Sequence, residues 1–478
     1  MLAAAAVVPA FADDNTTTTE TTARTLYWKG TQNYSNWSGA LWAESNTATE
    51  RTTFTAGDNA IINGTDVLQN NVDIDSNVSA GSISVIGGTS GNPAKVYFRV
   101  GTDGDVSLTA DTLSVSTTST LGFVVAGKLT GTFAATSGNV EVTQSKTGTI
   151  DLGGASFAAG TNLTLVNGTT IVNGEQSAFC GNLVVGKSAT AVIGGSDDAS
   201  WFMQKGCANQ TVTVQGTLDL GTEGRIYWWS NDESGKLVLD GGTIKGNYKW
   251  GEETSLQVQC STTVSVTSTS AIESGIRVMV ESILTLDTAD DATLTVSGKV
   301  KNYADASSIG GLKKTGAGSL VLSGDNSFGG SSCGFEIAEG TVEAASKTAL
   351  GAGAVTVASA ATLQIDVAAV AATGGITFRE GAKLALADTL FSGVTESVDV
   401  LVASTMTFGS TTLTDGDVTE TVSGYVTGAT SNVKKWTYNA TTGALTAVIP
   451  EPSAFGLLAG LGALALAISR RRRNHKKF

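Results

Sequence analysis

The chain has very little histidine and proline. Its single histidine, His475, stands near the C-terminal end, so no histidine of the main body could serve as a general base or in a Ser-His-Asp triad. Of the four prolines, only Pro93 falls between residues 10 and 449. Because proline removes a backbone donor from a β-ladder, its scarcity favours long, uninterrupted strands. The sequence therefore predicts extended β-structure without histidine-dependent catalysis.

Charge is also sparse, at 15% of residues, and it is mostly acidic, with a formal net charge of −14. An acidic surface repels phosphate backbones, which argues against nucleic-acid binding. The paired acids Asp197-Asp198 and Asp290-Asp291 lie in segments rich in small residues, where aspartate commonly stabilises turns. Carboxylates of a polysaccharide hydrolase are the alternative interpretation. We expect no catalytic residues, no metal site, no cofactor and no enzymatic activity.

The four cysteines, Cys180, Cys207, Cys260 and Cys333, are too widely spaced for a common zinc motif. If the protein is exported, disulfides are permitted. Cys180 and Cys207 are then the best candidate pair, because one turn of a coil could bring them together. Four isolated, buried thiols remain the favoured interpretation.

Glycine is abundant, with 58 residues, and it punctuates a recurring pattern between residues 95 and 447. The pattern is an alternating strand, a Gly or Asn turn and another alternating strand. One copy contains Val212, Val214, Gly216, Leu218 and Leu220. Period-two alternation buries one face of a strand, and recurrence every 18 to 35 residues or so suits the coils of a solenoid. We predict an all-β solenoid over 91–449, with a small β-sandwich as the alternative at 95–180 and 380–447.

The N-terminal residues 1–12, MLAAAAVVPAFA, are typical of the end of a secretory signal peptide. Ala10 and Ala12 are the small residues of the expected cleavage site, with cleavage after Ala12. The positively charged n-region is missing, so we expect the natural start to lie upstream. A buried N-terminal strand is the alternative. Residues 13–25 are rich in Asn and Thr and are predicted to be a flexible leader.

The segment 26–90 carries Trp28, Trp37 and Trp42, followed by a Gly-Asp turn and alternating strands. This order resembles the opening segment of autotransporter-like β-repeat proteins. We predict an aromatic β-cap that covers the first open turn of the stack, because an exposed turn invites edge pairing. Stacking of carbohydrate on the tryptophans is the alternative.

Residues 310–330 read GGLKKTGAGSLVLSGDNSFGG and are followed by Gly340-Thr341-Val342 and Ala349-Leu350-Gly351. Over 310–365 the sequence resembles the autotransporter-associated β-strand repeat, although Cys333 to Phe335 departs from its usual Gly-rich turn. The resemblance implies a right-handed parallel β-helix in which the motif residues are structural. The motif asparagine could satisfy turn backbone groups or stack in a ladder inside the coil.

The C-terminal tail, 450–478, has three parts in a fixed order. They are the triplet Pro450, Glu451 and Pro452, the uncharged apolar run 453–468, and the cations Arg470, Arg471, Arg472 and Arg473 with two lysines. The run is long enough for a short transmembrane helix, and the cations would hold its end in the cytoplasm. A permanent tail anchor and a buried core helix are the alternatives.

This tail resembles the PEP-CTERM sorting signal of Gram-negative bacteria. The resemblance implies that exosortase, a membrane transpeptidase-like enzyme, recognises and removes the tail after transient anchoring in the inner membrane. The product is then expected at the cell surface or in the extracellular matrix. The processing chemistry would occur at the 450–452 triplet.

A cluster of aromatic residues, Tyr227, Trp228, Trp229, Tyr248 and Trp250, is the best candidate for ligand binding. Stacked on consecutive coils, these rings could form one external patch for sugar rings. Lateral packing under a loop is the favoured alternative.

We therefore predict an exported, exosortase-sorted structural or adhesive β-solenoid that is not catalytic. Further partners would be exopolysaccharide or the surface glycans of a host or neighbouring cell. The alternative is a carbohydrate-binding or carbohydrate-active β-helix protein of the envelope or exopolysaccharide matrix.

Overall fold

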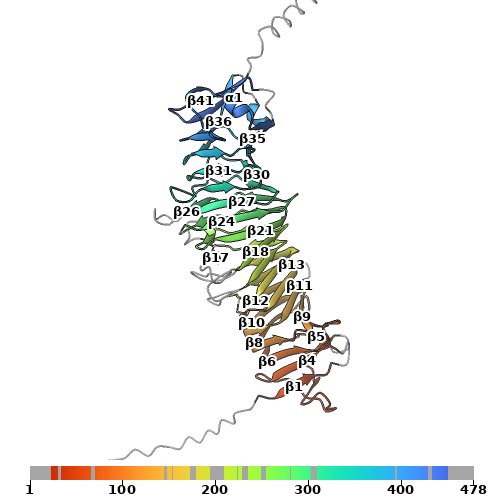
Figure 1. Ribbon diagram of the computed structural model, residues 1–478. Helices are drawn as coiled ribbons and strands as arrows, with labels where there is room; N and C mark the ends of the chain where they lie inside the picture. The colour runs from red at the N-terminus through yellow and green to blue at the C-terminus, as the bar shows by residue number, and fades with distance from the viewer. Residues whose placement is uncertain are drawn as a thin grey trace, which may run out of the picture.

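The polypeptide winds into an elongated rod, as the computed structural model in Figure 1 shows. The rod is a β-solenoid with almost no helix. Strand β1 (Thr25–Trp28) lies at one end and β41 (Lys435–Asn439) at the other. The structure describes residues 23–30, 34–65, 70–144, 148–152, 154–172, 179–193, 209–222, 224–228, 235–248, 254–279, 281–302, 309–392, 394, 396–428 and 433–449.

Two long parallel ladders run along the rod and join the strands of successive turns. Ladder 1 consists of β2 (Ser35–Asn36), β5 (Asn71–Asp73), β7 (Ala94–Val100), β9 (Ser119–Val125), β11 (Asn139–Gln144), β13 (Asn162–Val172), β14 (Asn182–Val192), β15 (Thr211–Val214), β18 (Lys236–Asp240), β21 (Thr262–Ser268), β24 (Ile283–Thr288), β27 (Gly311–Thr315), β29 (Phe335–Ile337), β31 (Val355–Val357), β34 (Ile376–Phe378) and β37 (Met406–Phe408).

Ladder 2 runs beside it and shares β13 and β14, which contribute one half to each ladder. Its other strands are β1, β4 (Asn59–Asn63), β6 (Val78–Ile86), β8 (Asp105–Val115), β10 (Lys128–Ser137), β12 (Thr149–Leu152), β16 (Thr217–Asp219), β19 (Thr243–Lys245), β22 (Ser270–Ile272), β25 (Thr293–Val296), β28 (Ser319–Leu322), β30 (Gly340–Ala344), β32 (Ala361–Ile365), β35 (Lys383–Leu386) and β40 (Val426–Gly428).

A third, shorter ladder closes the coil in the middle of the rod. Ladder 3 consists of β17 (Ile226–Trp228), β20 (Thr254–Val258), β23 (Gly275–Val278) and β26 (Val300–Asn302), all parallel. Each turn of this region therefore contributes three strands around a common interior.

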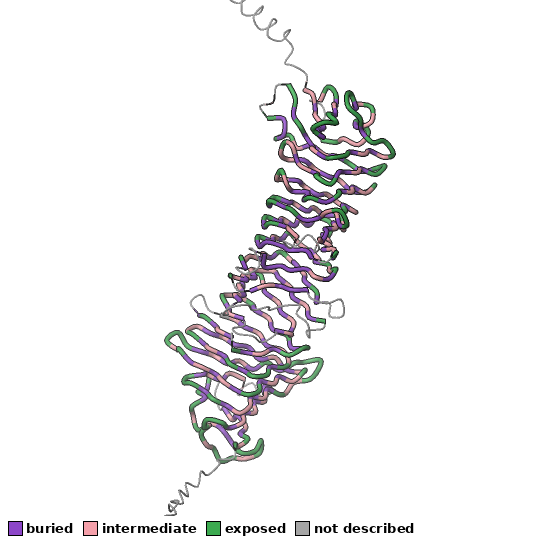
Figure 2. The backbone as a smooth tube through the Cα atoms, turned by 90° about the vertical axis from the view of Figure 1, so that its left-hand side faces the viewer, coloured by how far each residue is buried: buried purple, intermediate pink, exposed green. Residues whose placement is uncertain are grey.

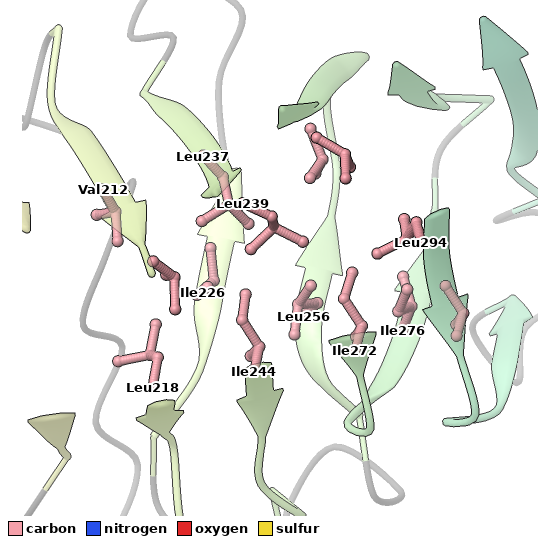
Figure 3. Close-up of a cluster of buried hydrophobic side chains, with 14 of the residues drawn as sticks. Val212, Leu218, Ile226, Leu237, Leu239, Ile244, Leu256, Ile272, Ile276 and Leu294 are labelled. Atoms are coloured by element: carbon pink, nitrogen blue, oxygen red, sulfur yellow. The ribbon is translucent and has the colours of Figure 1, made fainter. Parts of the chain in front are cut away.

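The core lies inside the coil because every second side chain of a strand points inward. Buried and partly exposed residues alternate along the turns (Figure 2), as in β18, where Leu237 and Leu239 are fully buried. Figure 3 shows inward side chains from all three ladders meeting, including Leu237 of ladder 1, Ile244 of ladder 2 and Leu256 of ladder 3.

Strand register aligns these inward residues into columns that run along the rod. In ladder 1, Val212 pairs with Leu237, which pairs with Val264 of the next turn. The column continues through Leu286 to Lys314, the only charged residue among these five. Apolar burial at about 25 cal/mol per Å² is the main driving force for such a stack.

Outward side chains also form a ladder on this face. Asn162 donates from its side chain to Asn139 (2.8 Å), and Asn182 donates to Asn162 (2.9 Å). The Asn182 side-chain oxygen accepts from the Thr211 backbone (2.8 Å). Neighbouring turns are therefore joined by side-chain hydrogen bonds as well as by the backbone ladder.

At the N-terminal end, β3 (Trp42–Ala43) folds back antiparallel to β1. Trp28, Trp37 and Trp42 are all buried, and Trp42 donates from its ring nitrogen to the carbonyl of Trp37 (3.0 Å). The ring centroid of Trp42 lies 5.0 Å from that of Trp28 and 4.7 Å from that of Trp37. The aromatic residues therefore pack together within the first turns of the stack.

At the C-terminal end, the sheet direction changes. β33 (Val370–Ala372) pairs with β36 (Ser397–Ala403) in parallel, and β36 then pairs antiparallel with β42 (Ala444–Val448). The remaining elements of this end are β38 (Thr411–Thr412), β39 (Gly416–Asp417), the 3-10 helix η2 (Asp388–Phe391) and the one-turn helix α1 (Thr419–Ser423).

The predicted all-β solenoid is confirmed. The β-sandwich alternative fails at 95–180, because β7 to β13 continue the parallel ladders there. At 380–447 the antiparallel strands β39, β41 and β42 attach to the solenoid through β36 and do not form a separate sandwich.

Candidate functional site

The described body ends directly before the Pro-Glu-Pro triplet. Strand β42 ends at Val448, and the next residue, Ile449, donates its backbone N–H to the carbonyl of Glu396 (2.8 Å). The triplet at Pro450, Glu451 and Pro452, the apolar run and the arginine cluster lie outside the described residues. The last described residue of the body thus stands one position before the predicted processing motif.

Within the described part of the chain, no helix is long and apolar enough to cross a membrane. The predicted transmembrane run, 453–468, lies beyond that part. The predicted signal-peptide residues Ala10 and Ala12 also lie outside it, so both terminal segments stay predictions from the sequence.

The lysine of the repeat-like segment lies inside the coil. Lys314 is fully buried, and its ammonium group donates to the carbonyls of Thr315 and Gly316 (2.7 Å each) and of Glu339 (3.4 Å). Burial lowers the pKa of Lys314 to about 8, although the negative charges of Asp287 and Glu339 partly oppose this. The lysine therefore holds a turn together and is not aimed at a ligand.

The asparagine of the same segment also binds backbone groups. The side-chain oxygen of Asn326 accepts from the Val300 N–H (2.8 Å), and its amide nitrogen donates to the Ala349 carbonyl (3.0 Å). Asn326 is 4% exposed and so connects the turns before and after its own. Asn326 therefore hydrogen-bonds to backbone groups, the first of the two roles predicted for it, and not to other asparagines in a ladder.

The structure also shows why position 316 of this segment requires glycine. Gly316 has φ +74°, and a Cβ at this position would lie 2.2 Å from the carbonyl oxygen of Thr288. Any other residue would therefore clash with the preceding turn as well as strain its own backbone.

The predicted external aromatic patch does not form from the residues that are described. Trp228 and Tyr248 are each 1% exposed, and Tyr227 is 8% exposed. Trp228 lies two positions after the inward-pointing Ile226, so period-two alternation turns it to the same interior. Sugar rings cannot stack on these three residues, while Trp229 and Trp250 lie outside the described residues.

Two of the four cysteines are free and buried, namely Cys260 and Cys333. Cys180 is part of a disulfide bond. Its predicted partner, Cys207, lies outside the described residues, so the pairing stays a prediction. The favoured interpretation of four isolated thiols does not hold for Cys180.

The acidic pair Asp290-Asp291 lies in a turn between β24 and β25, and Asp291 adopts φ 63°. This is the left-handed conformation that aspartate tolerates in turns. Asp197 and Asp198 lie outside the described residues. The structure brings together no group of three or more possible metal-ligating side chains within its described ranges.

Residues 448–473 match the family model of the PEP-CTERM protein-sorting motif. No curated protein and no solved structure matches the chain. The likeness of 310–365 to the autotransporter-associated repeat is not identified by these comparisons and stays a prediction. The chain thus carries a PEP-CTERM sorting signal behind a β-solenoid, and this signal implies export to the cell envelope or surface and processing by exosortase.

Proposed function

We propose that the protein is a passive structural or adhesive rod, presented at the surface of a Gram-negative cell or in its matrix after exosortase removes the tail. The 16 strands of ladder 1, each about 4.8 Å from the next, give a rod of roughly 70 Å. The interior is mostly apolar along both long ladders, which suits a scaffold that resists proteolysis.

The observation that carries this proposal is the position of the processing motif. Ile449, the last described residue, is hydrogen-bonded into the body at the opposite end of the rod from β1. Cleavage at the triplet would leave every described strand intact. If the new C-terminus is attached to an envelope component, the N-terminal end of the rod points away from the cell.

We propose further that the body is not an enzyme. Two observations support this. The described acidic pair Asp290-Asp291 occupies a turn, and the ammonium group of Lys314 donates its hydrogen bonds to backbone carbonyls. These groups serve the fold, which leaves presentation of the surface as the remaining role.

The test is to express the chain with and without an active exosortase in a bacterium that carries this sorting system. Surface fractions should contain a shortened protein only when exosortase is active, and the double variant Pro450→Ala/Pro452→Ala should stay in the inner membrane. Equal surface amounts of the uncleaved protein in both strains would contradict the proposal.

A further inference from the structure

Three polar side chains lie in a row on the outward face of ladder 1, near the N-terminal end. Asn36 of β2 is in register with Asp73 of β5, and Asp73 is in register with Arg99 of β7. Because neighbouring strands lie about 4.8 Å apart, the row spans about 10 Å. All three residues line one surface pocket of about 680 Å³. We call it the Tyr34 pocket after the aromatic residue that packs against the lining residue Arg99.

The side-chain polar groups of this row keep their hydrogen-bonding capacity open. Within the described chain, no hydrogen-bond partner occupies the side chains of Asn36, Asp73 or Arg99. Burial raises the pKa of Asp73, although the charge of Arg99 partly opposes this. A partly dehydrated acceptor and a donor with five N–H groups therefore lie next to each other without hydrogen-bond partners, and a ligand could satisfy both.

An aromatic ring stands beside the same pocket. The guanidinium carbon of Arg99 lies 4.0 Å from the ring centroid of Tyr34, and Tyr34 is 52% exposed. Tyr34 has φ 92°, a conformation that a bulky residue rarely adopts and that costs conformational energy. One ring face is covered by the guanidinium, which leaves the exposed part of the ring for a ligand.

The charge around the pocket selects against anionic ligands. Asp75 and Asp103 line the pocket together with Asp73, against the single cation Arg99. The Asp75 carboxylate accepts from the backbone N–H (3.1 Å) and the hydroxyl of Ser38, so it is held in place. Phosphate, sulfate and uronate groups would meet three carboxylates and one guanidinium.

We propose that the Tyr34 pocket binds a neutral oligosaccharide. The C–H face of one sugar ring would stack on Tyr34, as apolar surface packs on an aromatic ring. Hydroxyls of the adjoining sugar unit, each both a donor and an acceptor, would bond to Arg99, Asp73 and Asn36. A row of about 10 Å has room for two sugar units. The biological setting at a cell surface rests on the proposed function, but the binding itself does not.

The experiment is an array of neutral cello-, malto-, manno- and xylo-oligosaccharides of two to six units, probed with the purified full-length chain. Calorimetric titration with the best binder then gives the affinity. We expect binding by the wild type, at least tenfold weaker binding by Tyr34→Ala and by Asp73→Asn, and retained binding by Tyr34→Phe, which keeps the ring.

The matched control is Arg379→Leu, which removes an exposed arginine from a pocket farther along ladder 1. It should bind like the wild type, and circular dichroism should show that all four variants are folded. Absence of neutral-glycan binding, or unchanged affinity in Tyr34→Ala, would overturn the proposal. None of these results would affect the sorting account, because the assay does not depend on exosortase.

Discussion

Lys314 donates from its ammonium group to the carbonyl oxygen of Gly316 at 2.7 Å, inside the solenoid. In register, Lys314 stands between the apolar residues Leu286 and Ile337 of the adjacent turns. Burial of the charge is unfavourable and lowers the pKa to about 8, while the backbone carbonyls recover part of this energy. Lys314 therefore stabilises the fold mainly by filling space in the core and by holding the turn, and its charge adds little net stability.

Lys314→Met should change the free energy of unfolding by no more than about 1 kcal/mol, because it keeps the side-chain volume and removes a buried charge. Lys314→Ala should cost about 2 to 4 kcal/mol through the cavity that it leaves. Urea unfolding measures both. Equal destabilisation by the two variants would mean that the hydrogen bonds, and not the volume, hold the turn.

The same site predicts a pH effect. The folded-state pKa of about 8 lies below the unfolded value of 10.5, so the unfolded chain binds the proton more tightly. Wild-type stability relative to Lys314→Met should rise between pH 8 and 10.5. A difference that stays constant across this range would contradict a buried, protonated lysine.

The carboxyl groups of Glu343 and Asp366 lie within hydrogen-bonding reach of each other on the outer side of ladder 2. Their hydrogen bond, burial and the charge of Asp366 together raise the pKa of Glu343 to about 7 from an ordinary 4.5. The stabilisation is fully present below pH 4.5 and is lost as the pH rises through 7. We expect a lower melting temperature at pH 8 than at pH 5.5, and a smaller difference in Glu343→Gln. The control Glu336→Gln removes an acid that pairs with Lys313 (2.9 Å) and should keep the wild-type difference.

Asp58 gives the opposite dependence at acid pH. Burial alone would raise its pKa, but hydrogen bonds from Arg24 and Thr55 lower it to about 2 from 3.8. The stabilisation is present above pH 3.8 and is lost as the pH falls through 2. Asp58→Asn should cost about 1 to 3 kcal/mol at pH 7, because Asp58 is only 3% exposed. The control Asp105→Asn removes an exposed salt bridge to Lys128 and should change the free energy of unfolding very little.

The tryptophans at the N-terminal end should act locally. Trp42→Ala should cost about 3 to 5 kcal/mol and speed amide exchange in β1 and β4, while β32 and β35 stay protected. The mirror variant is Trp436→Ala, since Trp436 is 3% exposed at the other end of the rod. It should speed exchange in β41 and β42 only. If either variant melts the whole rod at once, the turns do not behave as a nearest-neighbour stack.

The strands were predictable because their signal is local. The alternation of Val212 and Val214 with threonines predicts the inward face from four consecutive positions. The same rule would have placed Trp228 inside, two positions after Ile226, but the neighbouring tyrosine and tryptophan suggested an outward cluster. The prediction of an external patch was therefore wrong because it relied on the aromatic composition of the segment and not on its period-two alternation.

The Tyr34 pocket was not predictable in the same way. Asn36, Asp73 and Arg99 come from three different turns, and only the register of the ladder brings them together. Register depends on the lengths of the turns between strands, which period-two alternation does not specify. The positive φ of Tyr34 could not be predicted either, because tyrosine is normally expected in β-strands, where φ is negative.

The central claim is that the tail after Ile449 is a temporary sorting signal. Mass spectrometry of the mature protein, isolated from the surface of exosortase-positive cells, tests it most directly. We predict a C-terminal peptide that ends at or next to the 450–452 triplet, with no peptide from 453–478. A surface protein that still ends in Phe478 would contradict the account.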